Sequence, residues 1–335
     1  FKSTTERLGI VFTPVEVVDF IVKSVDVVLR KHFGKTIASE NVHILDPFTG
    51  TGTFITRTLH YLKSLMDKGE MSYADLVRKY TQELHANEIV LLSYYIAAIN
   101  IEAVFDDING EEDYLPFEGI VLTDTFESTE SEDTLDDSFF GTNDKRLKRQ
   151  QEKPITAIIG NPPYSAKQDN EDDNNNRVSY PILDNSLKTK WIDTSSAINK
   201  NGLLDSYIRA FRWSADKLKE NGIIAFITNS SYLDGVAMDG MRQALESEFD
   251  FIYIIDLKGQ IRRRSREQAK IEGGNIFNIM TGVAITILVK VPDFNSSKGE
   301  IRYFNIGDSL SRREKISRIS QLDSIQGIEN FDLIK

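Results

Sequence analysis

The segment at residues 155–164 constrains the fold of this chain more than any other, because a strand there must end abruptly. Residues 155–159 are apolar and mostly β-branched, which predicts a buried strand. The strand is followed in order by Gly160, Asn161, Pro162, Pro163 and Tyr164. Proline can join neither a strand ladder nor a helix interior, so the chain must form a rigid corner. Open α/β sheets bind ligands at the carboxyl ends of their strands, which makes this corner a predicted binding site.

The groups at this corner suit a planar ligand that carries an amino group. The lone pair of an aromatic amine is delocalised into its ring, so acceptors beside its hydrogens must draw electron density back to the nitrogen. The Asn161 side-chain oxygen and the Pro162 carbonyl are candidate acceptors, and Tyr164 can stack on the ring. The structural alternative is a proline turn after a core strand, with Asn161 as its cap and Tyr164 half-buried.

Residues 42–52 form a second candidate ligand-binding turn. An apolar run ends at Asp46, Gly50 and Gly52 follow, and a helical pattern comes next. The glycines allow the backbone to pass close to a ligand. A dinucleotide-binding turn would need a third glycine where the chain has Ile55, so a pyrophosphate cofactor is disfavoured. An ordinary strand-turn-helix unit is the structural alternative.

Asn161, Pro162, Pro163 and Tyr164 together resemble the catalytic motif of S-adenosylmethionine-dependent amino-methyltransferases. Residues 46–52 are similar to the cofactor motif of the DNA-modifying members, in which the glycines make room for the methionine part of the cofactor. The resemblance therefore implies S-adenosylmethionine as the cofactor. The residues that it assigns to cofactor binding in this turn are Asp46, Pro47, Phe48, Thr49, Gly50 and Gly52.

Phe12, Thr13 and Pro14 correspond, by the same resemblance, to a cofactor-contacting segment before the first helix. The residues alone predict that Thr13 caps this helix, that Pro14 is its first residue, and that Glu16 completes a capping box. The helix is then expected to bury a stripe of valine and isoleucine side chains. Capping alone would explain Thr13 and Pro14, so both interpretations stand.

Two acidic residues near the ends of the next predicted strands complete the implied cofactor site. Glu88 resembles the ribose-binding acid of the family, and its alternative role is to complement the dipole of the following helix. Asp124, with Thr125 and Phe126 beside it, matches the acid that contacts the adenine of the cofactor. By themselves, Asp124 and Thr125 are also typical of a turn that ends a strand.

The order of these segments resembles the γ arrangement of N6-adenine DNA methyltransferases, over about residues 8–290. It implies an α/β fold with a seven-stranded, mostly parallel sheet of the S-adenosylmethionine-dependent methyltransferase (Rossmann-like) type. Helices are expected on both faces, and one antiparallel strand near an edge. The family also places an aromatic residue before the last strand, against a flipped adenine. Phe277 occupies that position, and a core phenylalanine is the alternative.

Composition limits the chemistry that this chain of 335 residues can use. It has no cysteine, which excludes disulfides, thiolate metal sites and thiol catalysis, and its 4 histidines show no metal-binding spacing. No apolar run is long enough to cross a membrane and no secretory signal is evident, so a cytoplasmic protein is expected.

The net charge of -11 is unusual for a protein that binds DNA. The charge is uneven, however, because residues 127–137 are strongly acidic whereas residues 262–266 form a basic cluster. The acidic segment is typical of a solvated insertion. The basic cluster is either a contact for DNA phosphates or a solvated loop.

Residues 1–290 are predicted to form the catalytic domain, with insertions at about 127–153 and 165–201, the second a candidate lid over the extruded base. Residues 291–335 are expected to be a linker or the start of a DNA target-recognition region. Because the chain starts with Phe1 rather than methionine, we expect a piece of a longer polypeptide. Similar methylase segments belong to large fused restriction-modification enzymes, single-chain Type I-like or Type IIG. Their further domains include target-recognition, helicase and nuclease parts.

The function implied by the resemblance is that of a site-specific, adenine-specific DNA methyltransferase within a restriction-modification enzyme. It would transfer a methyl group from S-adenosylmethionine to the N6 amine of a flipped adenine in double-stranded DNA. The sulfonium is already a strong electrophile, so no metal is implied. One alternative is a protein-glutamine methyltransferase, which we would expect to lack the Phe-Thr-Pro helix and the long insertions. The others are an RNA amino-methyltransferase and a catalytically silent DNA-binding scaffold.

Overall fold

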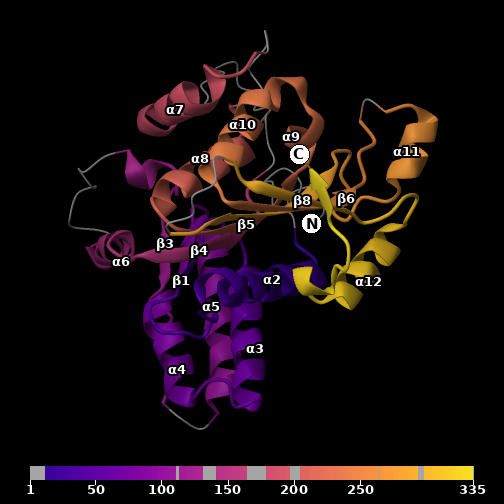
Figure 1. The fold of residues 1–335 in the computed structure, drawn as a ribbon. Coiled ribbons are helices and arrows are strands. Elements are labelled where there is room, and N and C mark those ends of the chain that lie inside the picture. The colour runs from indigo at the N-terminus through magenta and orange to yellow at the C-terminus, as the bar shows by residue number, and fades with distance from the viewer. Residues whose placement is uncertain are drawn as a thin grey trace.

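The computed structural model of the chain describes residues 12–110, 113–130, 141–163, 179–196, 204–262, 264–292 and 298–334. Strands and helices alternate along much of the chain, and the strands come together in one sheet (Figure 1). The strands are β1 (His43–Asp46), β2 (Leu84–Glu88), β3 (Ile120–Leu122), β4 (Ile155–Gly160), β5 (Gly222–Asn229), β6 (Phe251–Lys258), β7 (Val283–Lys290), β8 (Glu300–Asn305) and β9 (Asp332–Ile334).

The described residues contribute nine strands to this sheet, in the order β3-β2-β1-β4-β5-β7-β6-β8-β9. Neighbours from β3 to β5 pair in parallel, and β7 is antiparallel to both β5 and β6. This arrangement confirms the predicted α/β fold of the methyltransferase type. The predicted number of seven strands is wrong, because β8 pairs in parallel with β6 and β9 pairs antiparallel with β8. The two extra strands lengthen the sheet at the edge that β6 would otherwise leave unpaired.

The described residues beyond position 290 pack against the rest of the structure. Helix α12 (Arg312–Leu322) contacts α2 (Val15–Phe33), and its Ile319 is buried in the core on that face. The backbone N–H of Ile325 donates to the Ser24 hydroxyl of α2 at 2.9 Å. The sheet therefore continues past the boundary expected near residue 290. The role of residues 291–335 in leading to a target-recognition region stays a prediction.

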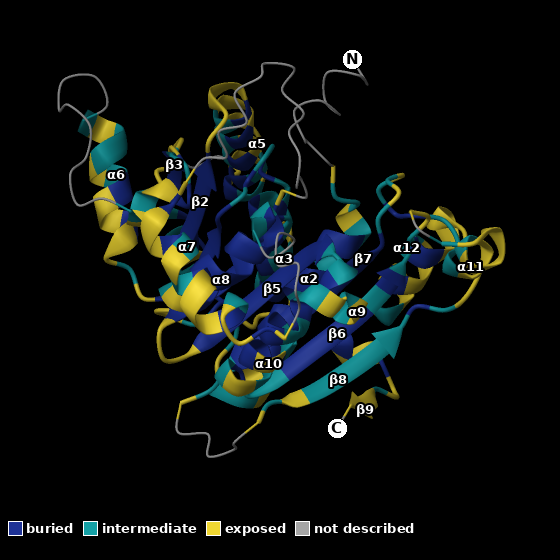
Figure 2. Cartoon of the chain, turned by 90° about the horizontal axis from the view of Figure 1, so that it is seen from above, coloured by how far each residue is buried: buried dark blue, intermediate teal, exposed yellow. Residues whose placement is uncertain are grey.

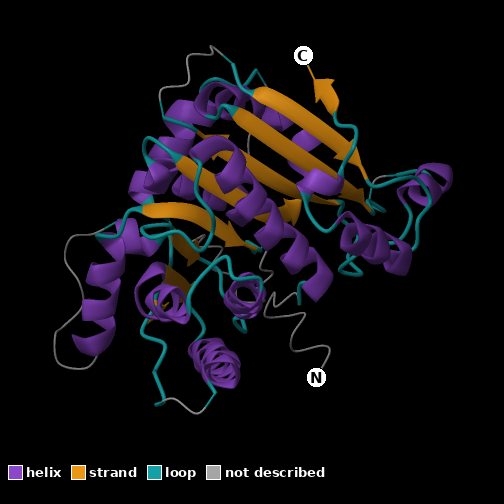
Figure 3. Cartoon of the chain, turned by 60° about the horizontal axis from the view of Figure 1, so that its bottom comes forward, coloured by secondary structure: helices purple, strands orange, loops and turns teal. Residues whose placement is uncertain are grey.

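Helices cover both faces of the sheet (Figures 1 and 3). One face carries α2, α3 (Thr53–Asp67), α4 (Tyr73–Arg78), α5 (Leu91–Asn109) and α12. The other face carries α7 (Pro181–Leu187), α8 (Ser206–Leu218) and α10 (Asp239–Glu248). Further helices are α6 (Gly141–Gln151), α9 (Ser231–Asp234) and α11 (Arg266–Glu272).

Each strand at the centre of the sheet contributes to two hydrophobic cores, one on each face. In β5, Ile223 and Ile227 enter the core beside α2 and α3, whereas Ile224 and Phe226 enter the core beside α8 and α10. Alternate side chains of a strand point to opposite faces, so a strand covered on both faces must be apolar at nearly every position. That is why β4 and β7 have continuous apolar sequences, and why the middle of the molecule is buried in Figure 2.

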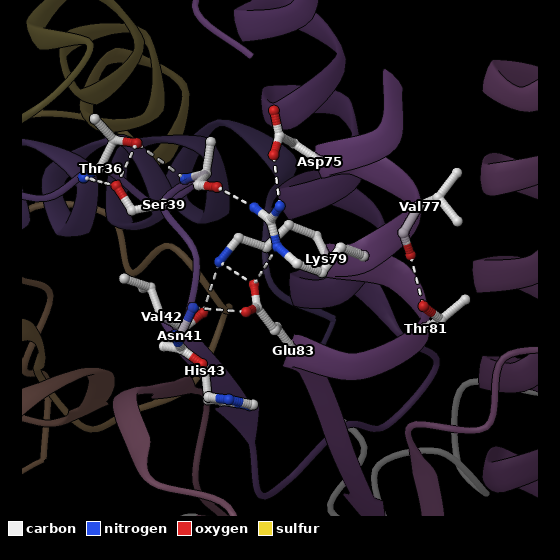
Figure 4. Close-up of polar contacts among 12 residues, drawn as sticks. Thr36, Ser39, Asn41, Val42, His43, Asp75, Val77, Lys79, Thr81 and Glu83 are labelled. Carbon is white, nitrogen blue, oxygen red and sulfur yellow. Dashed lines mark hydrogen bonds and ion pairs between the residues drawn. The ribbon is translucent and has the colours of Figure 1, made fainter. Parts of the chain in front are cut away.

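A buried ion pair joins the amino ends of β1 and β2 (Figure 4). The π-helical turn η1 (Lys79–Glu83) leads into β2 and places Lys79 Nζ 2.8 Å from the Glu83 carboxylate, with both side chains almost fully buried. Lys79 also donates to the Val42 carbonyl at 2.7 Å. Glu83 accepts from the Asn41 backbone N–H at 2.7 Å. The pair therefore holds the entries to β1 and β2 together, and these strands carry the predicted cofactor site at their other ends.

The two predicted insertions contain helices where the structure describes them. In the first, α6 buries Leu147 and Gln150. In the second, α7 and the π-helical turn η3 (Lys188–Ile192) pack on the α8 face, and Trp191 is fully buried. Most of the predicted acidic loop and the polar part of the predicted lid lie outside the described residues.

Candidate active site

The carboxyl ends of β1, β2, β3 and β4 lie at one edge of the sheet, and hydrogen bonds join the loops that follow them. The backbone N–H of Thr49, after β1, donates to the Asn87 carbonyl of β2 at 3.0 Å. The Thr125 hydroxyl, after β3, donates to the Pro47 carbonyl at 2.6 Å. The Asn87 side-chain amide donates to the same hydroxyl at 3.3 Å. The structure thus brings together three segments that the sequence assigned to one cofactor site.

The turn after β1 has a backbone shape that requires glycine. Gly50 and Gly52 have positive φ angles of 56° and 88°, which other residues rarely adopt. A Cβ at Gly52 would also lie 3.2 Å from Ile101 and 3.3 Å from Ala97, both in α5. A Cβ at Gly50 would meet no described atom within 4 Å. Gly52 is therefore needed for packing against α5, whereas Gly50 leaves space in which a ligand can approach the backbone.

Glu88, at the end of β2, is only 8% exposed and holds this turn in place. Its carboxylate accepts from the backbone N–H of Gly50 at 2.7 Å and from that of Val90 at 2.8 Å. Burial raises the pKa of Glu88, and these two backbone donors oppose the rise. An ionised carboxylate has about four acceptor positions, so positions are left for the hydroxyls of a ribose.

Asp46, at the end of β1, is fully buried beside the end of β4. Its Oδ1 accepts from the Phe48 backbone N–H at 3.1 Å, and its Oδ2 has no hydrogen-bond partner among the described residues. Burial raises the pKa of Asp46 to about 8, and the nearby Glu88 carboxylate adds to the rise. A Cβ on Gly160 would lie 2.9 Å from Asp46 Oδ1, so a larger residue at the end of β4 would have to displace the Asp46 carboxyl group. A buried oxygen without a donor is costly, and such groups concentrate at functional sites.

Asn161 presents its side-chain oxygen as an acceptor at the corner after β4. Its Nδ2 donates to the Thr13 hydroxyl at 3.0 Å, which fixes the orientation of the amide. Its Oδ1 is buried and has no hydrogen-bond partner among the described residues. Pro162 is buried and Pro163 is exposed, whereas Tyr164 lies outside the described residues. The corner therefore has a buried oxygen available where the sequence predicted an acceptor for an amine.

The segment before α2 contradicts the predicted helix cap. Pro14 occupies the N-cap position with an extended ψ of 136°, and α2 starts at Val15, so Pro14 is not the first helical residue. No side chain among the described residues caps α2, and the expected capping box with Glu16 is absent. The Thr13 hydroxyl accepts from Asn161 instead, which brings this segment to the corner. The ring of Phe12 is 63% exposed.

Asp124, in the loop after β3, is oriented by Tyr180 from the second insertion. Its Oδ2 accepts from the Tyr180 hydroxyl at 2.8 Å, and its Oδ1 accepts from the Phe126 backbone N–H at 2.9 Å. Burial, followed by the contact with Asp124, raises the pKa of Tyr180, so the phenol remains a donor. The Arg209 guanidinium lies 5.1 Å from the centroid of the Tyr180 ring. Phe126 is buried and packs edge-on against Phe48, with 5.6 Å between the ring centroids.

Three residues of this site were missed from the sequence: Asn87, Gly160 and Tyr180. Asn87 and Gly160 adjoin the predicted residues Glu88 and Asn161, so their positions beside strand ends were the available signal. Tyr180 follows a long polar stretch, and no local pattern connects it to Asp124.

Phe277 lies in the segment that leads into β7 and is half-buried against the core on the α2 face. Its backbone N–H donates to the Asn275 side chain at 2.8 Å. The antiparallel pairing matches Val283 of β7 with Asn229 of β5, so β7 starts at the edge where β5 ends. The topology therefore places this segment at the same edge of the sheet as Asn161. A contact between Phe277 and a target base stays a prediction.

The basic cluster at residues 262–266 is partly neutralised. Arg264 pairs with Asp234 at 3.2 Å and with Glu272 at 3.8 Å. Arg262 and Arg266 are exposed and are the better candidates for contacts with phosphates.

Among the described residues, no group of three or more histidine, aspartate and glutamate side chains is arranged to hold a metal ion. None of the described helices is long and apolar enough to span a membrane.

Comparison with known proteins identifies relatives of the chain. Residues 55–261 match the Eco57I restriction-modification methylase family. A comparison with curated proteins gave no significant match. Among solved structures, the ATP-dependent Type ISP restriction-modification enzyme LlaBIII bound to DNA is 64% identical, with a TM-score of 0.96. The match covers 100% of this chain and 23% of that enzyme.

Two further solved structures are also similar. A nuclease-deletion mutant of the Type ISP restriction-modification enzyme LlaGI, in complex with a DNA substrate mimic, is 57% identical with a TM-score of 0.93, over 97% of this chain and 26% of that one. The DrdV-DNA complex is 40% identical with a TM-score of 0.87, over 100% of this chain and 31% of that one. The chain thus spans less than a third of the length of each of these three structures.

Proposed function

This chain belongs to the Eco57I restriction-modification methylase family, and on that premise we propose that it methylates the N6 amine of adenine in double-stranded DNA, with S-adenosylmethionine as the methyl donor. The observation that carries the proposal is the buried Asn161 Oδ1, which has no partner among the described residues. An acceptor of this kind suits the hydrogens of an exocyclic amine. The DNA in the structures of LlaBIII and LlaGI supports DNA as the substrate.

The cofactor site fits S-adenosylmethionine in the character of its donors and acceptors. Gly50 leaves open space beside the backbone, and Asp46 Oδ2 is a buried acceptor without a partner among the described residues. Glu88 would accept from the ribose hydroxyls, and Asp124 would contact the adenine. The cofactor, when bound, supplies a methyl group on a positively charged sulfur. Burial favours the neutral form of Asp46, and a positive charge bound beside it would draw this carboxyl back toward its ionised form.

The chain's own residues would act on the amine rather than on the cofactor. Asn161 Oδ1 and the Pro162 carbonyl each accept one N–H, which turns the nitrogen lone pair out of the ring plane and toward the methyl group. As the new nitrogen-carbon bond formed and the methyl-sulfur bond broke, the nitrogen would become positive, so both hydrogen bonds would strengthen in the transition state. One N–H proton then leaves to solvent. The Thr13 hydroxyl keeps the Asn161 amide in the orientation that this role needs.

The target adenine must leave the DNA helix before it can reach the corner. Its N6 amine is paired inside the duplex, and swinging the base out costs a few kcal/mol of stacking and pairing. Contacts with DNA phosphates compensate for part of that cost but carry no sequence information. We therefore expect sequence selection to come from a target-recognition domain on the same polypeptide, as part of a larger restriction-modification enzyme.

The substrate that receives the methyl group can be identified with S-adenosylmethionine that is labelled in its methyl group. The chain, as part of the larger polypeptide that carries its target-recognition domain, is incubated with unmethylated genomic DNA, with RNA and with a protein mixture in separate reactions. We expect label in N6-methyladenine after the DNA is digested to nucleosides. Label in RNA or in protein glutamine would overturn the proposal in favour of those amino-methyltransferases. Cofactor binding without transfer to any substrate would favour a silent scaffold.

Replacing Glu88 by alanine should raise the Kd for S-adenosylmethionine by about 10- to 100-fold. The substitution removes charge-assisted acceptors that are worth about 1.5–3 kcal/mol each, and it also frees the Gly50 turn. Glu88→Gln should weaken binding less, because its amide oxygen still accepts. Calorimetric titration of the cofactor measures both. Unchanged affinity in Glu88→Ala would refute the ribose contact.

Replacing Tyr180 by phenylalanine should raise the Kd for the cofactor about fivefold and leave kcat at saturating cofactor unchanged. The variant removes the hydroxyl that orients Asp124 and keeps the ring beside Arg209. One lost hydrogen bond of about 1 kcal/mol accounts for the size of the effect. Tyr114→Phe is the matched control, because that exposed tyrosine donates to Glu102 away from the site. A fall in kcat at saturating cofactor would assign Tyr180 a different role.

A further inference from the structure

A small cavity of about 80 Å³ lies at the amino edge of the sheet, which is the edge opposite the Asn161 corner. It opens between the start of β2, helix α6 and the residues before β4. The strands separate it from the cofactor site by their own length, at roughly 3.3 Å per residue. The side chains that matter for its chemistry are His85, Glu118, Arg146, Arg149, Gln150 and Lys153.

The charged side chains make this cavity positive. Arg149 pairs with Glu118 at 3.0 Å, so one cation and the single carboxylate of the lining offset each other. Within the described part of the chain, neither Arg146 nor Lys153 has an ion-pair partner. Burial lowers the pKa of His85 to about 3, and cations that include Lys153 and Arg149 add to the fall. His85 therefore stays neutral, and the cavity keeps two uncompensated positive charges.

Two side chains of the cavity lining each have a buried hydrogen-bond donor without a partner among the described residues. Gln150 is only 6% exposed, and its Nε2 has no partner among the described residues. Arg146 donates from Nη1 to the Tyr94 hydroxyl at 3.3 Å, but its buried Nε has no described partner. A buried donor that is left unpaired is destabilising. A ligand that only accepts hydrogen bonds and carries negative charge would suit these two side chains and balance both cations.

We propose that this cavity binds a phosphate group, either as the free anion or at the end of a nucleotide. Phosphate oxygens are strong acceptors without competing donors, and arginine is well suited to them. The cavity, of about 80 Å³, has room for a small anion such as one phosphate group. A nucleotide would insert its terminal phosphate. This site is separate from methyl transfer and does not depend on the proposed function.

The test measures binding of inorganic phosphate to the full chain at constant ionic strength, by calorimetry and by thermal unfolding. We expect saturable binding and a rise in Tm of about 2–4 °C for the wild type. Gln150→Leu and Arg146→Met should each lower the affinity at least about tenfold, which is the effect of one charge-assisted hydrogen bond. Lys148→Met is the matched control, because this exposed lysine lies on the same helix but not in the cavity.

A second arm uses uridine diphosphate, which lacks the adenine that the cofactor site would accept. If uridine diphosphate binds more tightly than inorganic phosphate and this binding is lost in both cavity variants, the ligand is the phosphate end of a nucleotide. If uridine diphosphate binds equally or more weakly, the ligand is the free anion. Gln150→Leu removes an unpaired buried amide and should keep the fold, so the test remains valid if Arg146→Met unfolds. The proposal is overturned if phosphate does not bind saturably. It is equally overturned if Gln150→Leu and Lys148→Met bind as the wild type does, which would mean an adventitious ion only.

Discussion

Replacing Asn161 by alanine is expected to lower kcat for methyl transfer on the order of 10³-fold, while the Kd for S-adenosylmethionine changes by less than about twofold. The side-chain oxygen would act on the amine as its nitrogen gains positive charge, so the loss falls on the transition state rather than on cofactor binding. The cofactor residues Asp46 and Glu88 belong to other strands and keep their own contacts. Single-turnover transfer of labelled methyl and calorimetric titration measure the two quantities separately.

Two control variants make this result specific to the amide oxygen. Thr13→Val removes only the hydroxyl that accepts from Asn161 Nδ2, so kcat should fall about tenfold, which is far less than in Asn161→Ala. Asn185→Ala removes an exposed asparagine of α7 and should change neither quantity. If Asn161→Ala lost cofactor affinity and turnover in the same proportion, Asn161 would be a part of the cofactor site and not the acceptor for the amine.

The strand-end positions of the site could be predicted because they depend on short segments. The β-branched run before Gly160 and the two prolines after Asn161 define a strand and its end without help from the rest of the chain. Gly50 and Gly52 likewise mark a turn that needs positive φ. The fold class was implied by the resemblance of these ordered segments to the γ arrangement of DNA methyltransferases. Open α/β sheets place their ligands at the carboxyl ends of the strands, which predicts a common edge for the site.

Contacts between distant segments could not be predicted in this way. Thr13 and Asn161 are 148 positions apart, and the local pattern at Thr13 favoured a helix cap that the structure does not have. Tyr180 reaches Asp124 from 56 positions away, after a polar stretch that carries no periodic signal. The two extra strands, β8 and β9, were missed for a related reason. Their side chains are half-buried or exposed, so they lack the continuous apolar pattern of β4 and β7.

The buried ion pair of Lys79 with Glu83 is a further contact that the sequence does not reveal, and it leads to the largest expected effect on stability. Replacing Lys79 by methionine should lower the free energy of unfolding by about 3–5 kcal/mol, measured by urea denaturation. The variant leaves the buried Glu83 carboxylate with only the more distant Arg78 Nε, at 3.6 Å, in place of the ammonium at 2.8 Å, and it removes the donor to the Val42 carbonyl. The amino ends of β1 and β2 would lose the contacts of Lys79 that hold them together.

The matched control is Lys63→Met, because Lys63 and Asp67 form an exposed pair at the same spacing on α3. That change should alter stability by less than about 0.5 kcal/mol. The double variant Lys79→Met with Glu83→Gln should recover much of the loss, since neither member of the pair is then charged and the glutamine oxygen can still accept from Asn41. A double variant as unstable as Lys79→Met alone would show that the cost comes from packing and not from the unpaired charge.

The expected recovery follows from the balance between burial and pairing at this site. Burial lowers the pKa of Lys79 to about 8, even though Glu83 acts in the opposite direction. The protein therefore stabilises the charged ammonium less well than water does, and the ion pair as a whole adds little net stability. Its effect is to make the native arrangement of the two strand entries much more stable than any arrangement that separates the charges. That requirement acts on the strands whose opposite ends carry Asp46 and Glu88, so a stability defect at Lys79 should also weaken cofactor binding.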